Sequence, residues 1–307
     1  MLHETLGTMH RAVLFKKASD NNTVQCTACS HYCAIPENKT GICGVRKNVN
    51  GTLFLIVYGK PVALHIDPIE KKPLYHFYPG EKVLSLGTFG CNFRCDFCQN
   101  YEMSQMKDED RSGNKVDYFS EQLEDWSPGR IVQYAQEKNI PMISYTYNEP
   151  AIFVEYAHDI MLLAHENNIK NVYVSNGYES REALEYVGPY LDAANIDLKS
   201  FRDEFYRKLC GGKLMPVFET IKNLYERGVW LEITTLVIPG ENDSDEELQQ
   251  IAEFIAGIDK NIPWHISRFF PTYKMMDKEI TSYASLERAR EIGKAVGLKY
   301  VYVGNVM

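Results

Sequence analysis

At residues 90–100 the chain reads Gly90-Cys91-Asn92-Phe93-Arg94-Cys95-Asp96-Phe97-Cys98-Gln99-Asn100. Its three cysteines have the spacing C-x3-C-x2-C and directly follow an apolar run, 83–87, that is typical of a buried strand. Three thiolates this close together suit a soft metal. Because a cubane [4Fe-4S] cluster needs four iron ligands, three cysteines leave one iron open to another molecule. We therefore predict such a cluster on Cys91, Cys95 and Cys98; the alternative is a zinc knuckle that lacks its fourth ligand.

Beyond residue 82, short apolar runs alternate with amphipathic stretches. The predicted strands are Val83–Gly87, Met142–Tyr145, Val172–Ser175, Ala193–Asp197, Leu231–Val237, Trp264–Ser267 and Tyr300–Val303. The predicted helices are Pro128–Glu137, Ile152–Asn167, Ser180–Tyr190, Pro216–Glu226, Ser244–Ile258 and Ser285–Val296. This alternation predicts an α/β fold with a parallel sheet. About six such units indicate an open, partial (β/α)6 barrel at residues 81–307 rather than a full eight-unit barrel.

Residues 1–80 have a different pattern and are expected to form a small cysteine-rich, metal-binding domain. They contain Cys26, Cys29, Cys33 and Cys43, with the spacing C-x2-C-x3-C-x9-C. Four cysteines so close together predict either a closed zinc site or an auxiliary Fe–S cluster. The following segment, GTLFLIVYGKPVALHID, reads as a β-hairpin around Tyr58-Gly59-Lys60-Pro61.

Composition limits the classes of function. The net charge is −8, although residues 1–75 carry 9 Lys and Arg against 5 Asp and Glu, so the larger part of the chain is acidic. An acidic body argues against nucleic-acid binding. No apolar run approaches 18 residues and the N-terminus has no signal-peptide pattern, so we expect a cytoplasmic protein without a membrane span. In that compartment, clustered cysteines usually bind metal instead of forming disulfides.

Polar residues follow successive predicted strands, where the active site of a parallel barrel lies. These candidates are Asn148 and Glu149, Ser175 and Asn176, Asp197 and Lys199, then Leu236, with His265 and Arg268 around the sixth strand. Each has a purely structural alternative. Asn148 and Glu149 would cap the next helix, Asp197 and Lys199 would form a buried pair, Leu236 would belong to the core, and His265 would be a structural histidine.

Longer motifs resemble the radical S-adenosylmethionine (SAM) superfamily, and within it the pyruvate formate-lyase-activating enzyme group and the AmmeMemoRadiSam system radical SAM enzymes. They include CTACSHYC, YHFYPG, GTFGCNFRCDFCQN, SYTYNEPAIFVEY, VSNGY, IDLKSF, TLVIPGEND and PWHISRFFP. The resemblance implies a [4Fe-4S] cluster that cleaves SAM to a 5′-deoxyadenosyl radical. It also implies an electron donor of flavodoxin or ferredoxin type and association with AMMECR1- and Memo-type proteins.

The resemblance also implies roles for single residues. Glu149 would bind the SAM amino group, although Tyr147 and Asn148 replace two glycines of the superfamily motif. Lys199 would meet the SAM carboxylate, Leu236 the adenine, and His265 or Arg268 either SAM or the substrate. Only one of two acidic positions that hold a cation in those relatives, Asp197, is present.

Three functions follow from this sequence as alternatives. The first is a radical SAM enzyme that abstracts hydrogen from an unidentified substrate. The second is an activase that installs a glycyl radical in a partner enzyme, and the third is a zinc-binding interaction module without catalysis. Cys210 lies outside both cysteine groups and precedes Gly211-Gly212. It is either a catalytic thiol near the substrate or a small buried hydrophobic residue.

Overall fold

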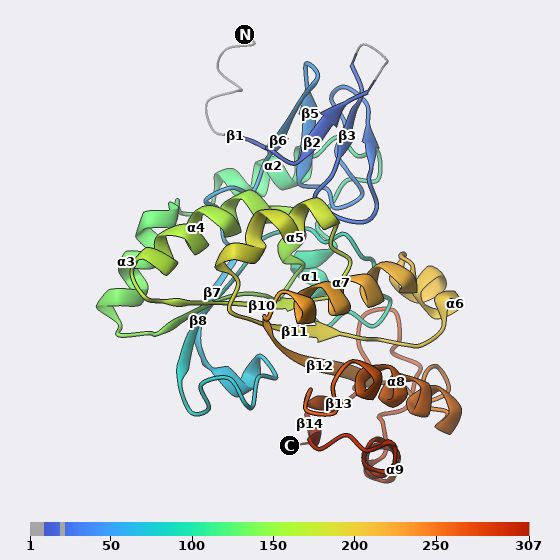
Figure 1. The fold of residues 1–307 in the computed structure, drawn as a ribbon. Coiled ribbons are helices and arrows are strands. Elements are labelled where there is room, and N and C mark those ends of the chain that lie inside the picture. The colour runs from blue at the N-terminus through green and yellow to red at the C-terminus, as the bar shows by residue number, and fades with distance from the viewer. Residues whose placement is uncertain (1–8, 19–21, 307) are drawn as a thin grey trace.

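The computed structural model describes residues 9–18 and 22–306. Eight strands form one sheet in the order β14-β13-β12-β11-β10-β9-β8-β7 (Figure 1). They are β7 (Ala63–Pro68), β8 (Lys82–Gly87), β9 (Met142–Tyr145), β10 (Lys170–Ser175), β11 (Ala193–Asp197), β12 (Trp230–Val237), β13 (Trp264–Arg268) and β14 (Val301–Gly304). Strands β8 to β14 are parallel and lie in chain order, and β7 pairs antiparallel with β8 at one edge. The prediction of a mostly parallel sheet is confirmed.

Helices connect these strands, as the alternating pattern predicts. The helices that match the predicted ones are α3 (Pro128–Glu137), α4 (Val154–Glu166), α5 (Arg181–Val187), α7 (Leu214–Glu226), α8 (Asp245–Ile258) and α9 (Tyr283–Val296). Local signals explain their starts: Ser244 Oγ accepts a hydrogen bond from the Glu247 amide, and three acidic residues favour the first turn of α8. The predicted helix at 152–167 is divided, because Pro150 opens a separate 3₁₀ turn, η2 (Pro150–Phe153), before α4.

Two insertions interrupt the alternation of strand and helix. The segment between β8 and α3 contains the short helices α1 (Tyr101–Ser104) and α2 (Asn114–Glu121). After β11, the helix α6 (Asp203–Phe205) continues into a π-helical turn, η4 (Tyr206–Cys210). A separate 3₁₀ turn, η3 (Gly188–Tyr190), follows α5.

The N-terminal strands form two small sheets. One contains β1 (His10–Arg11), β6 (Thr52–Leu55) and β5 (Arg46–Val49); the other contains β2 (Phe15–Lys17), β3 (Val24–Cys26) and β4 (Ala34–Ile35). The predicted hairpin around residues 58–61 is wrong, because β6 pairs with β5 and β7 joins the large sheet. The hairpin turn lies instead at Asn50 and Gly51, both with positive φ.

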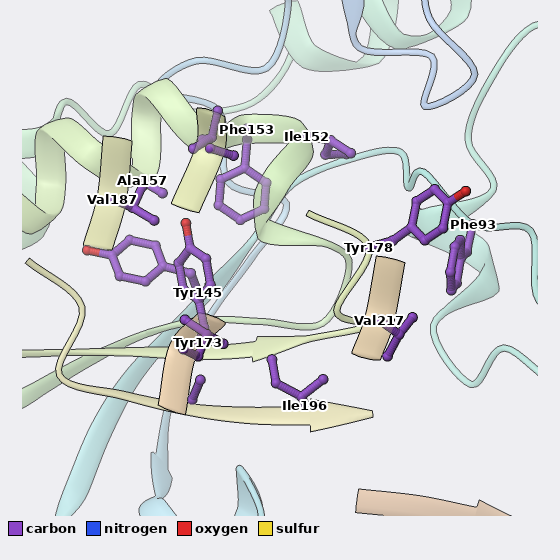
Figure 2. Close-up of a cluster of buried hydrophobic side chains, with 14 of the residues drawn as sticks. Phe93, Tyr145, Ile152, Phe153, Ala157, Tyr173, Tyr178, Val187, Ile196 and Val217 are labelled. Carbon is purple, nitrogen blue, oxygen red and sulfur yellow. The ribbon is translucent and has the colours of Figure 1, made fainter. Parts of the chain in front are cut away.

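A continuous hydrophobic core lies between the large sheet and its helices. Figure 2 shows Tyr145, Tyr173 and Ile196 of the sheet beneath residues of α4, α5 and α7. The same cluster reaches Phe93 in the cysteine loop, whose ring centroid lies 5.0 Å from that of Tyr178. The loop that carries the three cysteines is therefore part of the main core. In the described residues, no helix is long and apolar enough to cross a membrane.

A buried ion pair joins the N-terminal sheets to α4. Arg46 of β5 and Glu155 of α4 make two hydrogen bonds of 2.6 Å, and both side chains are at most 2% exposed. Glu155 also accepts hydrogen bonds from the amides of Val13 and Leu14. Burial raises the pKa of Glu155, but Arg46 outweighs this effect and lowers it. The carboxylate is therefore ionised and satisfied in the folded state.

Replacing Glu155 with Ala should lower the free energy of unfolding by about 3–5 kcal/mol, because it leaves the Arg46 charge buried and unpaired. Urea denaturation under anaerobic conditions measures this loss. Glu185→Ala is the control, because Glu185 pairs with Arg181 on an exposed helix surface and should change stability little. Equal losses in the two variants would show that the Arg46–Glu155 pair does not hold the N-terminal sheets in place.

Candidate functional site

The strand-end residues surround one cavity of about 550 Å³. Eleven of the predicted site residues line it: Cys91, Cys95, Cys98, Asn148, Glu149, Ser175, Asn176, Asp197, Lys199, Leu236 and His265. They come from segments as far apart as β8 and β13, which meet because the carboxyl ends of parallel strands lie at the same edge of a sheet. The structure therefore brings most of the predicted residues to one place.

The cysteine loop is anchored by backbone hydrogen bonds to η4. The amides of Arg94 and Asp96 donate to the carbonyls of Cys210 and Leu209, at 2.8 and 2.9 Å. Burial raises the pKa of the Cys91 and Cys98 thiols, and a hydrogen bond with Cys210 together with burial raises that of Cys95. Bare thiols in this loop are therefore neutral, and a bound metal would be needed to ionise them. Three soft donors around one cavity fit an iron–sulfur cluster that leaves one iron open.

Glu149 is buried and fixes the ends of β9 and β10 relative to each other. Its carboxylate accepts hydrogen bonds from the Ala151 amide at 3.2 Å, the Asn176 amide at 2.8 Å and the Ser175 hydroxyl at 2.9 Å. The first of these is a helix-capping bond, so the capping alternative is correct for Glu149. The carboxylate also lines the cavity, and the two roles coexist. Burial raises the pKa of Glu149 to about 7.

A second buried carboxyl group, Glu179, shares a hydroxyl with Glu149. Ser175 Oγ lies 2.9 Å from Glu149 Oε1 and 3.0 Å from Glu179 Oε1, and it accepts a hydrogen bond from the Gly177 amide. A hydroxyl donates one proton only, so one carboxyl group must itself be protonated and donate to Ser175. Glu179 receives no backbone amide at its carboxyl group and its Oε2 has no partner, so it is the protonated one. Burial, followed by the Glu149 charge, raises the pKa of Glu179 to about 8.

The turn between β9 and η2 holds the cysteine loop. The Asn148 side chain donates hydrogen bonds to Thr88 Oγ1 at 3.1 Å and to the Gly90 carbonyl at 2.9 Å. Asn148 therefore positions the loop, and the structure shows no capping bond from its side chain. Tyr147 has a φ of 71°, a conformation that favours glycine. Its hydroxyl donates to Asp67 at 2.9 Å, and the Lys72 ammonium lies 4.6 Å from the ring centroid.

Asp197 and Lys199 form the ion pair expected as one alternative. The distance between Lys199 Nζ and Asp197 Oδ2 is 2.7 Å, and the Lys199 side chain is only 12% exposed. Burial opposes the charge of Lys199, but Asp197 outweighs it and raises the pKa of the ammonium. Since Lys199 also lines the cavity, it presents a fixed positive charge near the cysteine loop. Asn176 lies nearby and donates to the Asn92 side chain at 2.8 Å.

Several residues of the cavity were missed in the sequence, because they lie in the connection between β7 and β8. This connection crosses the inside of the sheet, where Ile69 and Leu74 pack on Val83, Met142 and Val172. It brings Lys71, Lys72 and Tyr75 to the cavity. Glu232, which is also buried, accepts hydrogen bonds from the Tyr75 and His76 amides and lies 2.6 Å from His265 Nε2. His265 is thus held by Glu232, as its structural alternative expects, and still lines the cavity.

Six of the predicted residues lie outside the cavity lining. Arg268 is one of them: its guanidinium donates to the Thr281 carbonyl at 2.8 Å and lies 5.3 Å from the centre of the Phe270 ring. Cys210 is fully buried and faces Cys95 from behind the loop. This position favours the packing alternative over a catalytic thiol. Cys26, Cys29, Cys33 and Cys43 also lie outside the cavity, and all are free thiols.

Comparisons with known proteins agree with this geometry. The family model of the radical SAM superfamily matches residues 85–255. An uncharacterized protein of Methanocaldococcus jannaschii is 42% identical over 96% of this chain and 85% of its own length. A 4-hydroxyphenylacetate decarboxylase activating enzyme of Clostridioides difficile is 27% identical over 53% of this chain and 55% of its own. The fold resembles a radical SAM methyltransferase from Sphaerobacter thermophilus, with a TM-score of 0.55, 14% identity and coverage of 97% and 77%.

The paired carboxyl groups predict a pH-dependent stability. Both have raised pKa values in the folded state, so between about pH 5 and 8 the folded chain holds more protons than the unfolded chain and stability falls as pH rises. Glu179→Gln keeps the shape of the neutral form and should raise the free energy of unfolding at pH 8 by about 1–3 kcal/mol. Denaturation from pH 5 to 8 measures this gain.

The matched control is Glu182→Gln, because Glu182 lies on the next turn and hydrogen bonds from Tyr32 and Lys16 lower its pKa despite burial. It should not reproduce the gain at pH 8. A Glu179→Gln variant that follows the wild-type pH dependence would contradict the assignment of the proton to Glu179.

Proposed function

Since the chain belongs to the radical SAM superfamily, we propose that it is an enzyme that cleaves SAM reductively and uses the resulting 5′-deoxyadenosyl radical to abstract hydrogen from a substrate. The observation that carries this proposal is one cavity lined by three cysteine thiols, a buried glutamate and a buried lysine. When bound, a [4Fe-4S] cluster on Cys91, Cys95 and Cys98 supplies the electron that breaks the SAM sulfonium bond.

The residues of the cavity fit the two polar groups at the amino-acid end of SAM. Glu149 would accept hydrogen bonds from the amino group, a charge-assisted contact once the carboxylate is ionised. Lys199 would bind the carboxylate group, and Asp197 holds the lysine in place through their 2.7 Å contact. Ser175 and Asn176 keep Glu149 oriented toward the cavity. Leu236 offers an apolar surface for adenine, and His265 would face the substrate.

The proposal also includes the domain arrangement, the group within the superfamily and the expected partner proteins. We take the parallel strands at residues 81–307 as a partial (β/α)6 barrel, to which β7 adds an antiparallel edge strand, beside a cysteine-rich domain at residues 1–80. Among radical SAM groups, we propose the AmmeMemoRadiSam system enzymes, which the motifs of this chain resemble. AMMECR1- and Memo-type proteins are then the expected associates, and a flavodoxin or ferredoxin the expected electron donor.

A second candidate is an activase that installs a glycyl radical in a partner enzyme. The similarity to the Clostridioides difficile activating enzyme favours it. The resemblance to the activating enzymes implies an arginine at position 234, where this chain has Thr234, whose hydroxyl donates to the Asn195 side chain at 2.8 Å. Electron paramagnetic resonance of a reaction with a glycyl-radical enzyme separates the candidates, because only an activase produces the glycyl radical signal.

Single replacements of Cys91, Cys95 or Cys98 with Ala should abolish reductive SAM cleavage, because a cluster with two protein ligands is not retained. The measurement is 5′-deoxyadenosine formed with dithionite under anaerobic conditions, together with iron content. Cys210→Ala is the control. The Cys210 thiol lies beside Cys95 but does not line the cavity, so this variant should preserve cleavage. Cleavage near the wild-type rate in any of the three variants would refute the proposed cluster site.

Glu149→Gln should weaken SAM binding by about 10- to 100-fold, the loss expected for one hydrogen bond to a charged group. Because the pKa of Glu149 is raised to about 7, wild-type affinity should increase as pH rises from 6.0 to 7.5, whereas the variant should be insensitive to pH. Equilibrium binding to the cluster-loaded protein measures both effects.

Glu179→Gln serves as the matched control for this experiment. It replaces the neighbouring carboxyl group without changing the lining of the cavity, so SAM should still bind and the pH midpoint should stay near that of the wild type, because Glu179 is already neutral when Glu149 titrates. Unchanged affinity in Glu149→Gln would leave Glu149 as a helix cap only.

A further inference from the structure

The four N-terminal cysteines lie in one largely buried region. Cys26 ends β3, and its amide donates to the Cys33 carbonyl at 2.9 Å. A Cβ atom built on Gly41 would lie 3.6 Å from Cys43 Sγ and 3.8 Å from Cys33 Sγ, so both sulfurs lie close to residue 41. Cys26, Cys29 and Cys43 are at most 9% exposed, and none of the four forms a disulfide. We call these four residues the cysteine quartet.

The chemistry of the quartet is that of a metal site. Cys26, Cys29 and Cys43 are buried and Cys33 is partly buried, and a metal would use all four as soft thiolate ligands. In the described chain, no three such ligands are close enough to hold a single ion. Zinc would therefore draw the sulfurs together, and a four-iron cluster would occupy a wider space.

The quartet adjoins the cysteine loop of the cavity directly. Gly90, which precedes Cys91, has a φ of 84°, and a Cβ atom there would lie 2.4 Å from the Cys43 carbonyl oxygen. Only glycine fits at this position, because the backbone that carries Cys43 occupies the space of a side chain. The Gly90 carbonyl in turn accepts the Asn148 side chain at 2.9 Å. The last cysteine of the quartet and the first cysteine of the loop are thus separated by one backbone contact.

The segment between Cys26 and Cys33 makes three further contacts with residues that are adjacent in sequence, or nearly so, to residues that line the cavity. His31 Nε2 lies 2.9 Å from the Asn92 carbonyl in the cysteine loop. The Ser30 amide donates to the Tyr178 carbonyl at 3.1 Å, and the Ser30 hydroxyl donates to the Glu179 carbonyl. These contacts reach the loop that holds Cys91 and the turn after β10 that orients Glu149. The positions of this loop and this turn therefore depend on the course of residues 26–33. Between Cys26 and Cys29 that segment has no hydrophobic residue larger than alanine.

We propose that Cys26, Cys29, Cys33 and Cys43 bind a metal centre through four thiolates, and that this centre positions the cysteine loop and the Ser175–Glu179 turn for SAM. A bound metal fixes the path of residues 26–43 and, through Cys43, Ser30 and His31, the two walls of the cavity. Metal binding by the quartet does not depend on the proposed function, whereas the positioning of the cavity for SAM rests on it. The bound group is either zinc or an Fe–S cluster, since both accept four thiolates.

The metal is tested in a variant with Cys91, Cys95 and Cys98 all replaced by Ala, which leaves the quartet as the remaining cysteine cluster. Anaerobically purified protein should hold about one zinc per chain, or about four irons with inorganic sulfide and a brown colour. Adding Cys26→Ala and Cys33→Ala should remove that metal. A triple variant that holds neither zinc nor iron would overturn the proposal, whatever the outcome of SAM assays on the wild type.

The coupling is tested by SAM affinity in protein with an intact cavity. Cys26→Ala with Cys33→Ala should lose the quartet metal, keep the iron of the cysteine loop and weaken SAM binding at least about ten-fold, equivalent to about 1.4 kcal/mol. Unchanged affinity in the metal-depleted variant would overturn the coupling. Circular dichroism checks that this variant is folded.

A milder pair of variants keeps the coupling testable if the double variant fails to fold. His31→Ala removes the contact with Asn92 and should weaken SAM binding by about 2- to 10-fold with the quartet metal retained. Tyr32→Phe is the matched control, because the Tyr32 hydroxyl bonds Glu182 on the surface and should leave affinity unchanged. Equal affinities in the two variants would overturn the coupling through His31.

Discussion

The buried carboxyl group of Glu149 is the constraint on which the site depends. It accepts two backbone amides, from Ala151 and Asn176, and one hydroxyl, so it joins the end of β9 to the end of β10. The Asn176 side chain donates to the Asn92 side chain, and the Asn148 side chain donates to the Gly90 carbonyl, so both strand ends are connected to the cysteine loop. A carboxylate is costly to bury without partners. These amides therefore explain both why Glu149 is tolerated in the interior and why the loop has one position.

The parallel sheet could be predicted from the sequence because its signals are local. Apolar runs bounded by polar turns give the strands, and caps such as Ser244 give the helices. The hairpin at 58–61 failed for the opposite reason. Residues 52–55 and 63–68 both read as strands, but their partners are set by tertiary packing: the Asn50-Gly51 turn returns β6 to β5, and β7 completes the edge of the large sheet. The Asn-Gly pair is itself a local hairpin signal that the prediction overlooked, whereas nothing in the local pattern of residues 63–68 indicates their partner.

The site was predictable to the extent that it follows the strand ends. His265 and Arg268 illustrate the limit, because residues near a strand end point to both sides and only one side is the cavity. His265 faces Glu232 and the cavity, whereas Arg268 bonds Thr281. Lys72 and Tyr75 were missed because they come from a connection that packs inside the sheet through Ile69 and Leu74. The packing of this connection against the sheet is a long-range feature, and no local sequence pattern indicates it.

Tyr147 shows how the chain accommodates its departure from the glycine-rich motif of the superfamily. A positive φ at a residue with a side chain costs on the order of 1–2 kcal/mol, so contacts elsewhere must offset it. The Tyr147 hydroxyl bonds Asp67 and its ring lies beside Lys72, while Lys72 also pairs with Asp67 at 2.8 Å. These partners lie on β7 and the connection after it. The side chain that replaces glycine therefore links the turn before Glu149 to the antiparallel edge strand, and the glycine-free turn and the added strand are parts of one arrangement.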